Sequence, residues 1–144
     1  MAQFFHPKVG MVLMCDFQGF QPPEINKRRP VVVVGEEMVG RQGTCIVVPL
    51  SSRAPDPIMP FHHMLDPTAL PHAIRKRSSW AKCDLVTTVA CWRLDRLRVG
   101  QDALGKRLYA TPSIRPEDLL AVRRAVLAAL HLTGLVAFAI DSET

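Results

Sequence analysis

The sequence lacks the closely spaced ligands that a structural metal site requires. Its four cysteines, Cys15, Cys45, Cys83 and Cys91, are scattered, and no CxxC pair or Cys/His cluster joins them. A tetrahedral zinc site needs such spacing. We therefore expect reduced cysteines that mostly lie in the core, and no metal or other cofactor.

The chain also lacks a segment that would direct it to or through a membrane. Residues 1–10 show no basic stretch followed by an apolar run and a small-residue cleavage site. The largely apolar stretch 119–140 contains Arg123 and Arg124, and Gly134 interrupts what remains. Because a spanning helix needs about 20 mostly apolar residues, we predict a cytoplasmic protein with no membrane span.

What the sequence does contain is typical of one globular domain, which we predict over residues 1–144. With 144 residues, 48% of them hydrophobic, the chain can bury a sizeable core but is too short for two ordinary domains. No internal repeat is present. Lys and Arg number 18 against 13 for Asp and Glu. This surplus suits a polyanionic partner such as nucleic acid, although a mildly basic protein often has none.

Short β-branched runs between prolines and glycines fill the first two thirds of the chain, a pattern typical of small antiparallel strands. We predict strands at 9–17, 29–35, 43–50, 61–65, 80–89 and 106–111, and a short helical turn at 93–97. The predicted loops are 18–28, 51–60 and 66–79. The second and third strands should pair through a hairpin around Gly40 and Gly43.

The last part of the chain instead predicts a helix over about 116–131, followed by a tail at 133–144. A proline and two acids at 116–118 favour a helix start. Leucines and valines lie on one helix face and alanines on the other. Such a helix should pack on the domain and on a second subunit, unless it frays after Arg124. Arg123 falls near the middle of the leucine face, where a charge needs a partner.

The stretch NKRRPVVVVG, residues 26–35, places Lys27, Arg28 and Arg29 directly before an apolar strand. A rigid strand entered through Pro30 would hold the Arg29 guanidinium still, while the two preceding cations attract a phosphate backbone. The alternative is a solvated strand end whose charges block the addition of another strand.

The order of these motifs resembles that of the MazF/PemK family of toxin–antitoxin endoribonucleases. The shared features are a first strand ending in DF, then RRPVVVV, IVVPLSS about twenty residues later, WAKCDLVTTV with RLDRL, and a terminal helix, together spanning about 7–132. The resemblance implies a mainly β protein with α, built as a small SH3-like β-barrel with a C-terminal α-helix. It further implies a homodimer formed through that helix, a cognate antitoxin protein, and metal-independent cleavage of single-stranded RNA.

The resemblance also implies a catalytic pair, the arginine of the Arg-Pro motif and a hydroxyl residue just after the next strand. These fall on Arg29 and Ser51, with Ser52 as the neighbouring possibility. Cleavage without a metal uses the substrate's 2′-hydroxyl as nucleophile, so the protein must move protons and stabilise charge on the phosphate. An arginine can hold two phosphoryl oxygens, and a serine can donate to another. Asp16 could orient Arg29 across the sheet or cap its own loop.

Further RNA contacts are predicted at Lys27, Arg28, Ser52, Arg53, Arg75, Lys76, Arg77 and Asp84. The basic run 75–77 could instead meet an acidic antitoxin tail or be solvated. In many family members the segment that matches CDLVTTV has glutamine after the acid and an arginine two residues on. This chain has Leu85 and Thr87 at those positions.

Histidines and tryptophans are the other candidates for the site. His62 and His63 could divide the acid and base roles near neutral pH, but adjacent strand residues face opposite sides, so at most one should line a given site. Structural or solvent-facing histidines are the alternative. Trp80 and Trp92 could stack on bases, although Trp80 in particular suits the core.

The leading prediction is a sequence-selective, metal-independent endoribonuclease toxin of a toxin–antitoxin system. Two other functions stay open. A protein with the same barrel could have lost cleavage and bind RNA, DNA or a protein such as a topoisomerase, because a fold does not fix chemistry. A structural phage or plasmid protein would neither bind RNA nor be toxic.

Overall fold

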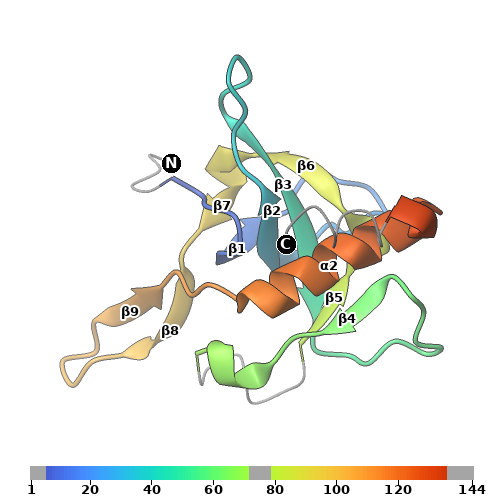
Figure 1. The fold of residues 1–144 in the computed structure, drawn as a ribbon. Coiled ribbons are helices and arrows are strands. Elements are labelled where there is room, and N and C mark those ends of the chain that lie inside the picture. Colours follow the sequence, from blue (N-terminus) through green and yellow to red (C-terminus); the bar gives the residue numbers. More distant parts are fainter. Residues whose placement is uncertain (1–5, 72–78, 136–144) are drawn as a thin grey trace.

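The computed structural model describes residues 6–71 and 79–135. In this part of the chain, most strands join one curved antiparallel sheet, and helix α2 (Pro116–Ala129) crosses its front in Figure 1. A two-stranded hairpin projects from one side. The expected class, mainly β with a C-terminal helix, is confirmed.

The strands are short and separated by turns. Those of the main sheet are β1 (Val12–Asp16), β2 (Arg28–Gly35), β3 (Thr44–Ser51), β4 (His62–Met64), β5 (Trp80–Lys82), β6 (Thr87–Ala90) and β7 (Leu94–Asp95). The projecting hairpin consists of β8 (Leu97–Gln101) and β9 (Arg107–Ala110). Three 3₁₀ turns of the described residues are η1 (Pro67–Ala69), η2 (Cys83–Leu85) and η3 (Cys91–Arg93).

The sheet has the strand order β4-β5-β3-β2-β1-β7, and β6 also pairs with β3. Strand β3 has two partners along one edge, because its first half pairs with β6 and its last two residues pair with β5. The chain then crosses through η3 from β6 to β7 at the other side of the sheet. No ladder in the described residues joins β6 to β7, so the SH3-like barrel is not closed by hydrogen bonds.

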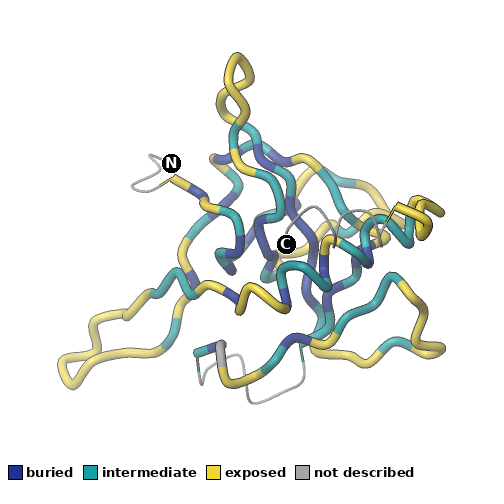
Figure 2. Tube along the Cα trace, in the orientation of Figure 1, coloured by how far each residue is buried: buried dark blue, intermediate teal, exposed yellow. Residues whose placement is uncertain are grey.

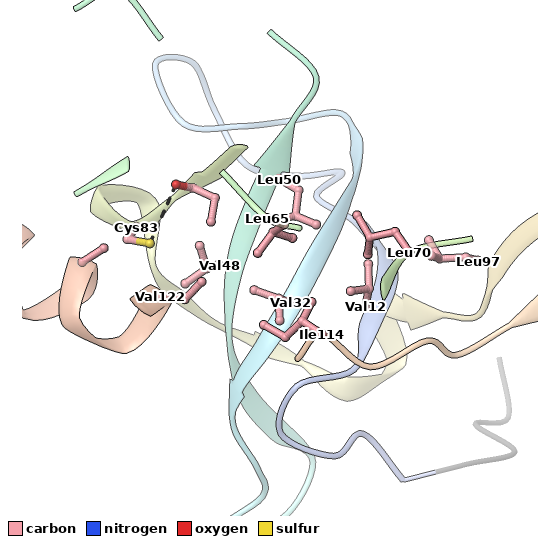
Figure 3. Close-up of a cluster of buried hydrophobic side chains, with 12 residues drawn as sticks. Val12, Val32, Val48, Leu50, Leu65, Leu70, Cys83, Leu97, Ile114 and Val122 are labelled. Atoms are coloured by element: carbon pink, nitrogen blue, oxygen red, sulfur yellow. Dashed lines mark hydrogen bonds between the residues drawn. The ribbon is translucent and has the colours of Figure 1, made fainter. Parts of the chain in front are cut away.

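The valine run of β2 gives the sheet an apolar surface on both sides. We call the side that α2 covers the helix face, and there Val32 and Val48 pack in a core with Val122 of the helix (Figure 3). On the opposite side, the far face, Val31 and Val47 join a second core. All five side chains are fully buried, and each contributes roughly 1.5–3 kcal/mol relative to exposure. Figure 2 shows this buried centre, together with the exposed tips of the β2–β3 hairpin and of the projecting β8–β9 hairpin.

Two expected elements differ in the structure. The strand predicted at 80–89 is broken by η2 into β5 and β6, whose pairings with β3 differ in register by three residues, the length of the turn. The turn predicted at 93–97 lies at η3 instead. Leu94 and Leu97 have a helical spacing and are both buried, but they belong to separate strands.

The hairpin expected around the two glycines is confirmed, because β2 and β3 pair on either side of it. Gly40 and Gly43 have φ values of 79° and 88°, a region that favours glycine. The expected loop 66–79 begins with η1, and its residues 72–78 lie outside the described residues.

The cysteines are free and buried, as expected. Burial raises the pKa of Cys15, Cys45 and Cys83 to about 12, so these thiols stay protonated and are poor nucleophiles at neutral pH. Within 6–71 and 79–135, no group of three or more His, Cys, Asp or Glu side chains could hold a metal ion.

Helix α2 begins at the expected proline and continues to Ala129, so the alternative of a helix that frays after Arg124 is wrong. Its buried residues are Asp118, Val122 and Ala125, and this stripe of smaller side chains replaces the expected leucine face as the centre of the contact. Arg123 lies at its exposed flank and donates to the carbonyl of Val34 at 3.3 Å. No helix of the described chain is long and apolar enough to cross a membrane.

A buried carboxylate fixes the start of α2. Asp118 is 3% exposed. Its Oδ1 accepts a hydrogen bond from His63 Nε2 at 2.8 Å, and its Oδ2 accepts from the Asp66 amide at 3.2 Å and Arg115 Nε at 3.3 Å. Burial by itself would raise the pKa of Asp118, but the three donors outweigh burial and the pKa is lowered. This cluster ties β4 and η1 to the helix.

We expect Asp118→Ala to lower the free energy of unfolding by about 1–3 kcal/mol at pH 7, because buried donors lose their acceptor. The folded-state pKa of Asp118 is below its ordinary value of 3.8. The carboxylate therefore stabilises the fold above that value, and its contribution is lost as the pH falls through the folded-state pKa. Urea unfolding at pH 7 and at a pH well below 3.8 should show that the loss of stability caused by Asp118→Ala becomes smaller at acid pH.

The matched control is Glu117→Ala, which removes the adjacent acid whose side chain is 72% exposed. Its effect should stay small at both pH values, since exposed ion pairs contribute little. If Asp118→Ala lowered the free energy of unfolding by the same amount at both pH values, the ionised carboxylate would not be the stabilising group.

Candidate functional site

Strands β2 and β3 bring Arg29 and Ser51 to the same place. The pairing of β2 with β3 ends at Val31 and Pro49, and its register continued by two residues sets Arg29 opposite Ser51. Residues opposite each other on antiparallel strands share a face, with Cβ atoms about 4.5–5.5 Å apart. The side chains of Arg29 and Ser51 therefore leave the backbone at neighbouring positions on the far face, at the end of both strands.

Both groups are free to meet a ligand. Arg29 is exposed and makes no ion pair with the residues described. Ser51 is half-buried, and its Oγ accepts a hydrogen bond from the Arg53 amide at 3.1 Å. Because this contact uses Oγ as an acceptor, the hydroxyl hydrogen remains able to donate. The pair therefore offers three or more donors to an anion.

A pocket of about 240 Å³ lies near the pair along β3. Its lining includes Pro49, which is two residues from Ser51 on the same face of β3. The loop after β1 forms one wall and the η2 region the other, through Phe17, Phe20, Glu24, Ile25, Asp84, Leu85, Val86 and Thr87. Two carboxylates thus border a mostly apolar pocket, whose size suits a single small planar group.

The pocket contains positions that the sequence indicated and others that it did not. Asp84, Leu85 and Thr87 were singled out, and Leu85 is 37% exposed, so an apolar side chain faces the opening. Phe20 and Glu24 were not expected. They lie in a loop rich in glycine and proline, and only the pairing of its flanking strands brings it over the far face.

Arg93 holds the loop wall in place. Its Nη1 donates to the carbonyls of Asp16 at 2.9 Å and Gln18 at 2.7 Å. The guanidinium also lies 5.1 Å from the ring centre of Phe20 and 4.7 Å from that of Trp92. Phe20 in turn meets Phe17 edge to face at 5.4 Å. One arginine therefore connects η3 to the loop that lines the pocket.

The other predicted contact residues lie on the flanking loops or on another face of the strand. Arg28 pairs with Asp16 and so points to the side opposite Arg29. Of the two roles considered for Asp16, capping is the one observed, because its Oδ1 accepts from the Gln18 amide at 2.9 Å. Three further candidates on the flanking loops are exposed, namely Lys27, Ser52 and Arg53. The basic run 75–77 lies outside the described residues.

The two histidines border a different hollow, of about 340 Å³, between β4 and α2. Both line it, because it lies at the edge of the sheet and not over one face, so the expectation that only one would line a given site was wrong. His63 binds Asp118, and His62 Nδ1 accepts from the Met59 amide at 3.0 Å. These contacts tie His63 to α2 and His62 to the turn before β4.

Comparison with known proteins identifies the family. A model described as PemK-like, MazF-like toxin of type II toxin–antitoxin system matches residues 8–130. The chain belongs to this family. YifN of Escherichia coli (strain K12) is 31% identical over 157 residues, with 94% of this chain and 99% of YifN covered. An uncharacterized protein of Haemophilus influenzae is 29% identical over 143 residues, with 90% and 94% covered.

Solved structures of toxins of this family share the fold. MazF from Deinococcus radiodurans matches with a TM-score of 0.62 at 20% identity, over 88% of this chain and 98% of that one. A mycobacterial endoribonuclease, solved in complex with its cognate antitoxin, matches with a TM-score of 0.57 at 19% identity, over 88% and 96%. The resemblance found in the sequence is thereby confirmed for family and fold.

We expect Arg93→Ala to loosen the pocket wall. Loss of two carbonyl contacts and two cation–π contacts should lower the free energy of unfolding by about 1–3 kcal/mol. Hydrogen exchange should accelerate at the Phe20 amide, which bonds to the carbonyl of Phe17 at 3.0 Å. Arg96→Ala is the control, because Arg96 also stacks on an aromatic ring, that of Tyr109 at 4.7 Å, but lies away from the loop. Equal exchange at Phe20 in both variants would contradict this role.

Proposed function

We propose that this member of the family is the toxin of a type II toxin–antitoxin pair, an endoribonuclease that cleaves single-stranded RNA at selected sequences without a metal ion. The observation that supports this most is the register of β2 and β3, which, continued to the strand ends, brings the exposed Arg29 opposite Ser51, two residues from a residue that lines a pocket. Family membership supplies the reaction class.

Arg29 would bind the phosphoryl group and stabilise the charge that develops on it. Its planar fork can bind two oxygens at once and stays charged at any working pH. The strand that carries it is anchored by Val31, Val32 and Val33, all fully buried. A rigid support of this kind keeps the donors positioned before the reaction, so little reorganisation is needed during it.

The proposed reaction balances two proton transfers. The substrate's 2′-oxygen attacks phosphorus and loses its proton, while the bond from phosphorus to the 5′-oxygen breaks and that oxygen gains a proton. The products are a 2′,3′-cyclic phosphate and a 5′-hydroxyl end. Ser51 would hold a non-bridging oxygen in line for attack. Among the residues that line the pocket, Glu24 and Asp84 are the carboxylates that can accept a proton.

The charges around the pair suit an RNA backbone. Lys27 and Arg53 are exposed on the segments next to it, Arg28 is exposed on the opposite face of the strand, and the chain carries a formal net charge of +5. Contacts of this kind supply affinity that does not depend on sequence and weakens with salt. Sequence selection would come from the pocket, where Leu85 and Thr87 replace the larger polar residues common in the family.

The proposed partners are a cognate antitoxin and a second copy of this chain, in the cytoplasm. An antitoxin segment with apolar and acidic residues would fit the pocket and the surrounding cations. The second copy would pack on the outer side of α2, where Leu130 is 56% exposed.

We expect wild-type protein to cut a long single-stranded RNA in EDTA at discrete sites with 5′-hydroxyl ends. Arg29→Ala should lower the cleavage rate by at least about 10²–10³, the typical cost of removing one preorganised donor. Arg28→Ala is the matched control, because it removes an adjacent exposed arginine from the other face. It should mainly weaken binding and reduce the salt slope by about one. Mapped RNA ends and single-turnover rates are the measurements.

Intact RNA with folded wild-type protein would overturn the nuclease and favour a binding module on the same fold. If Arg28→Ala and Arg29→Ala lowered the cleavage rate equally, the position of Arg29 opposite Ser51 would not be what makes it catalytic.

We expect Ser51→Ala to lower the cleavage rate by about 10²–10³, while RNA affinity changes little, because one phosphate donor is lost among many contacts. Ser51→Thr should restore much of the rate, since it keeps the hydroxyl. Ser52→Ala serves as the neighbour control and should have the smaller effect. A larger effect at Ser52 would transfer the hydroxyl role to that position.

A further inference from the structure

The strand on the other side of β3 places an aromatic residue directly beside Ser51. Ser51 pairs with Trp80 of β5, and Trp80 pairs in turn with Met64 of β4. Because paired residues share a face, four side chains form one row across β2, β3, β5 and β4. We call this set, Arg29, Ser51, Trp80 and Met64, the transverse row.

Core packing within 6–71 and 79–135 does not account for Trp80. Its side chain is half-buried, and among the described residues it belongs neither to the two apolar cores nor to the side chains that pack against them. Met64, next along the row, is 48% exposed. A tryptophan gains most from full burial, so one kept at a solvent-facing row beside the arginine–serine pair points to a ligand.

The spacing suits a base next to a phosphate that is held at Ser51. Neighbours across strands have Cβ atoms about 4.5–5.5 Å apart, and an indole ring extends beyond its Cβ. Every nucleobase has a π-face that can stack on such a ring. Lys82, two residues from Trp80 on the same side of β5, adds a cation for the adjoining backbone.

We propose that Trp80 is the stacking platform for one of the two bases that flank the cleaved phosphate. The inference rests on the proposed nuclease function and adds a substrate-binding residue to it. The pocket at Pro49 lies along β3 from Ser51, whereas Trp80 lies across from it, so the two sites take different bases. Because stacking tolerates any base, Trp80 supplies affinity and the pocket supplies selection.

The test begins with sites mapped by wild-type cleavage in EDTA. A short RNA that spans one site is then made with 2′-deoxyribose before the cut, which removes the nucleophile and leaves the RNA intact. The chain has two tryptophans, so Trp92→Phe leaves Trp80 as the single reporter and Trp80→Phe leaves Trp92. We expect this RNA to quench the fluorescence of the Trp92→Phe protein strongly and that of the Trp80→Phe protein weakly.

Affinity gives the second measurement. Trp80→Ala should weaken binding of the blocked RNA roughly 10- to 100-fold, while Trp80→Phe, which keeps a ring, should lose only a few-fold. An abasic nucleotide at one of the two flanking positions should remove the difference between wild type and Trp80→Ala. That loss of difference would identify the stacked base, and a merely structural role for Trp80 would not produce it.

Unquenched Trp80 together with unchanged affinity in Trp80→Ala would overturn the platform, while cleavage by wild type would still uphold the nuclease. Wild-type protein that neither binds nor cuts RNA would overturn both. Circular dichroism checks that Trp80→Ala folds. The quenching experiment keeps Trp80 in place and therefore decides the question even if that variant does not fold.

Discussion

The pairing of β2 with β3 is the constraint on which the rest of this structure depends. The valine run of β2 is buried on both faces, so a slip of one residue would exchange every side chain between the two cores. Such a slip would also exchange Arg28 for Arg29 at the far face. The same burial that stabilises the sheet therefore selects which arginine stands beside Ser51.

The two faces of this sheet differ in what their polar side chains hold: one attaches the helix, and the other supports the pocket wall. On the helix face, the Asp118 cluster attaches α2 to β4 through His63, on the side of the sheet opposite Arg29. On the far face, Arg93 fixes the loop wall through backbone carbonyls and aromatic rings. Stability and the proposed chemistry can thus be changed by separate mutations, because few side chains serve both.

Membership of the PemK-like, MazF-like toxin family is compatible with a pocket that departs from the common pattern. Leu85 has no hydrogen-bonding group and Thr87 has one hydroxyl, whereas the glutamine and arginine found in many members offer several donors. A pocket with apolar walls and two carboxylates on its border can reject a base that offers no donor to those carboxylates, since they would be desolvated without a partner. In the proposed nuclease, such a pocket would supply the selection, and Trp80 with the surrounding cations would supply affinity.

The sequence by itself determined the local elements and their chemistry: the buried strand after Arg29, the hairpin at two glycines, the start of α2 at a proline, and the inert cysteines. Periodicity, charge and backbone preference are properties of neighbouring residues, so they can be read along the chain. Only the tertiary structure decided that β5 and β6 are separate, that Glu24 and Phe20 line the pocket, and that Trp80 lies opposite Ser51. Those relations depend on strand register and on contacts between distant segments, such as Arg93 with Gln18, and no local pattern encodes them.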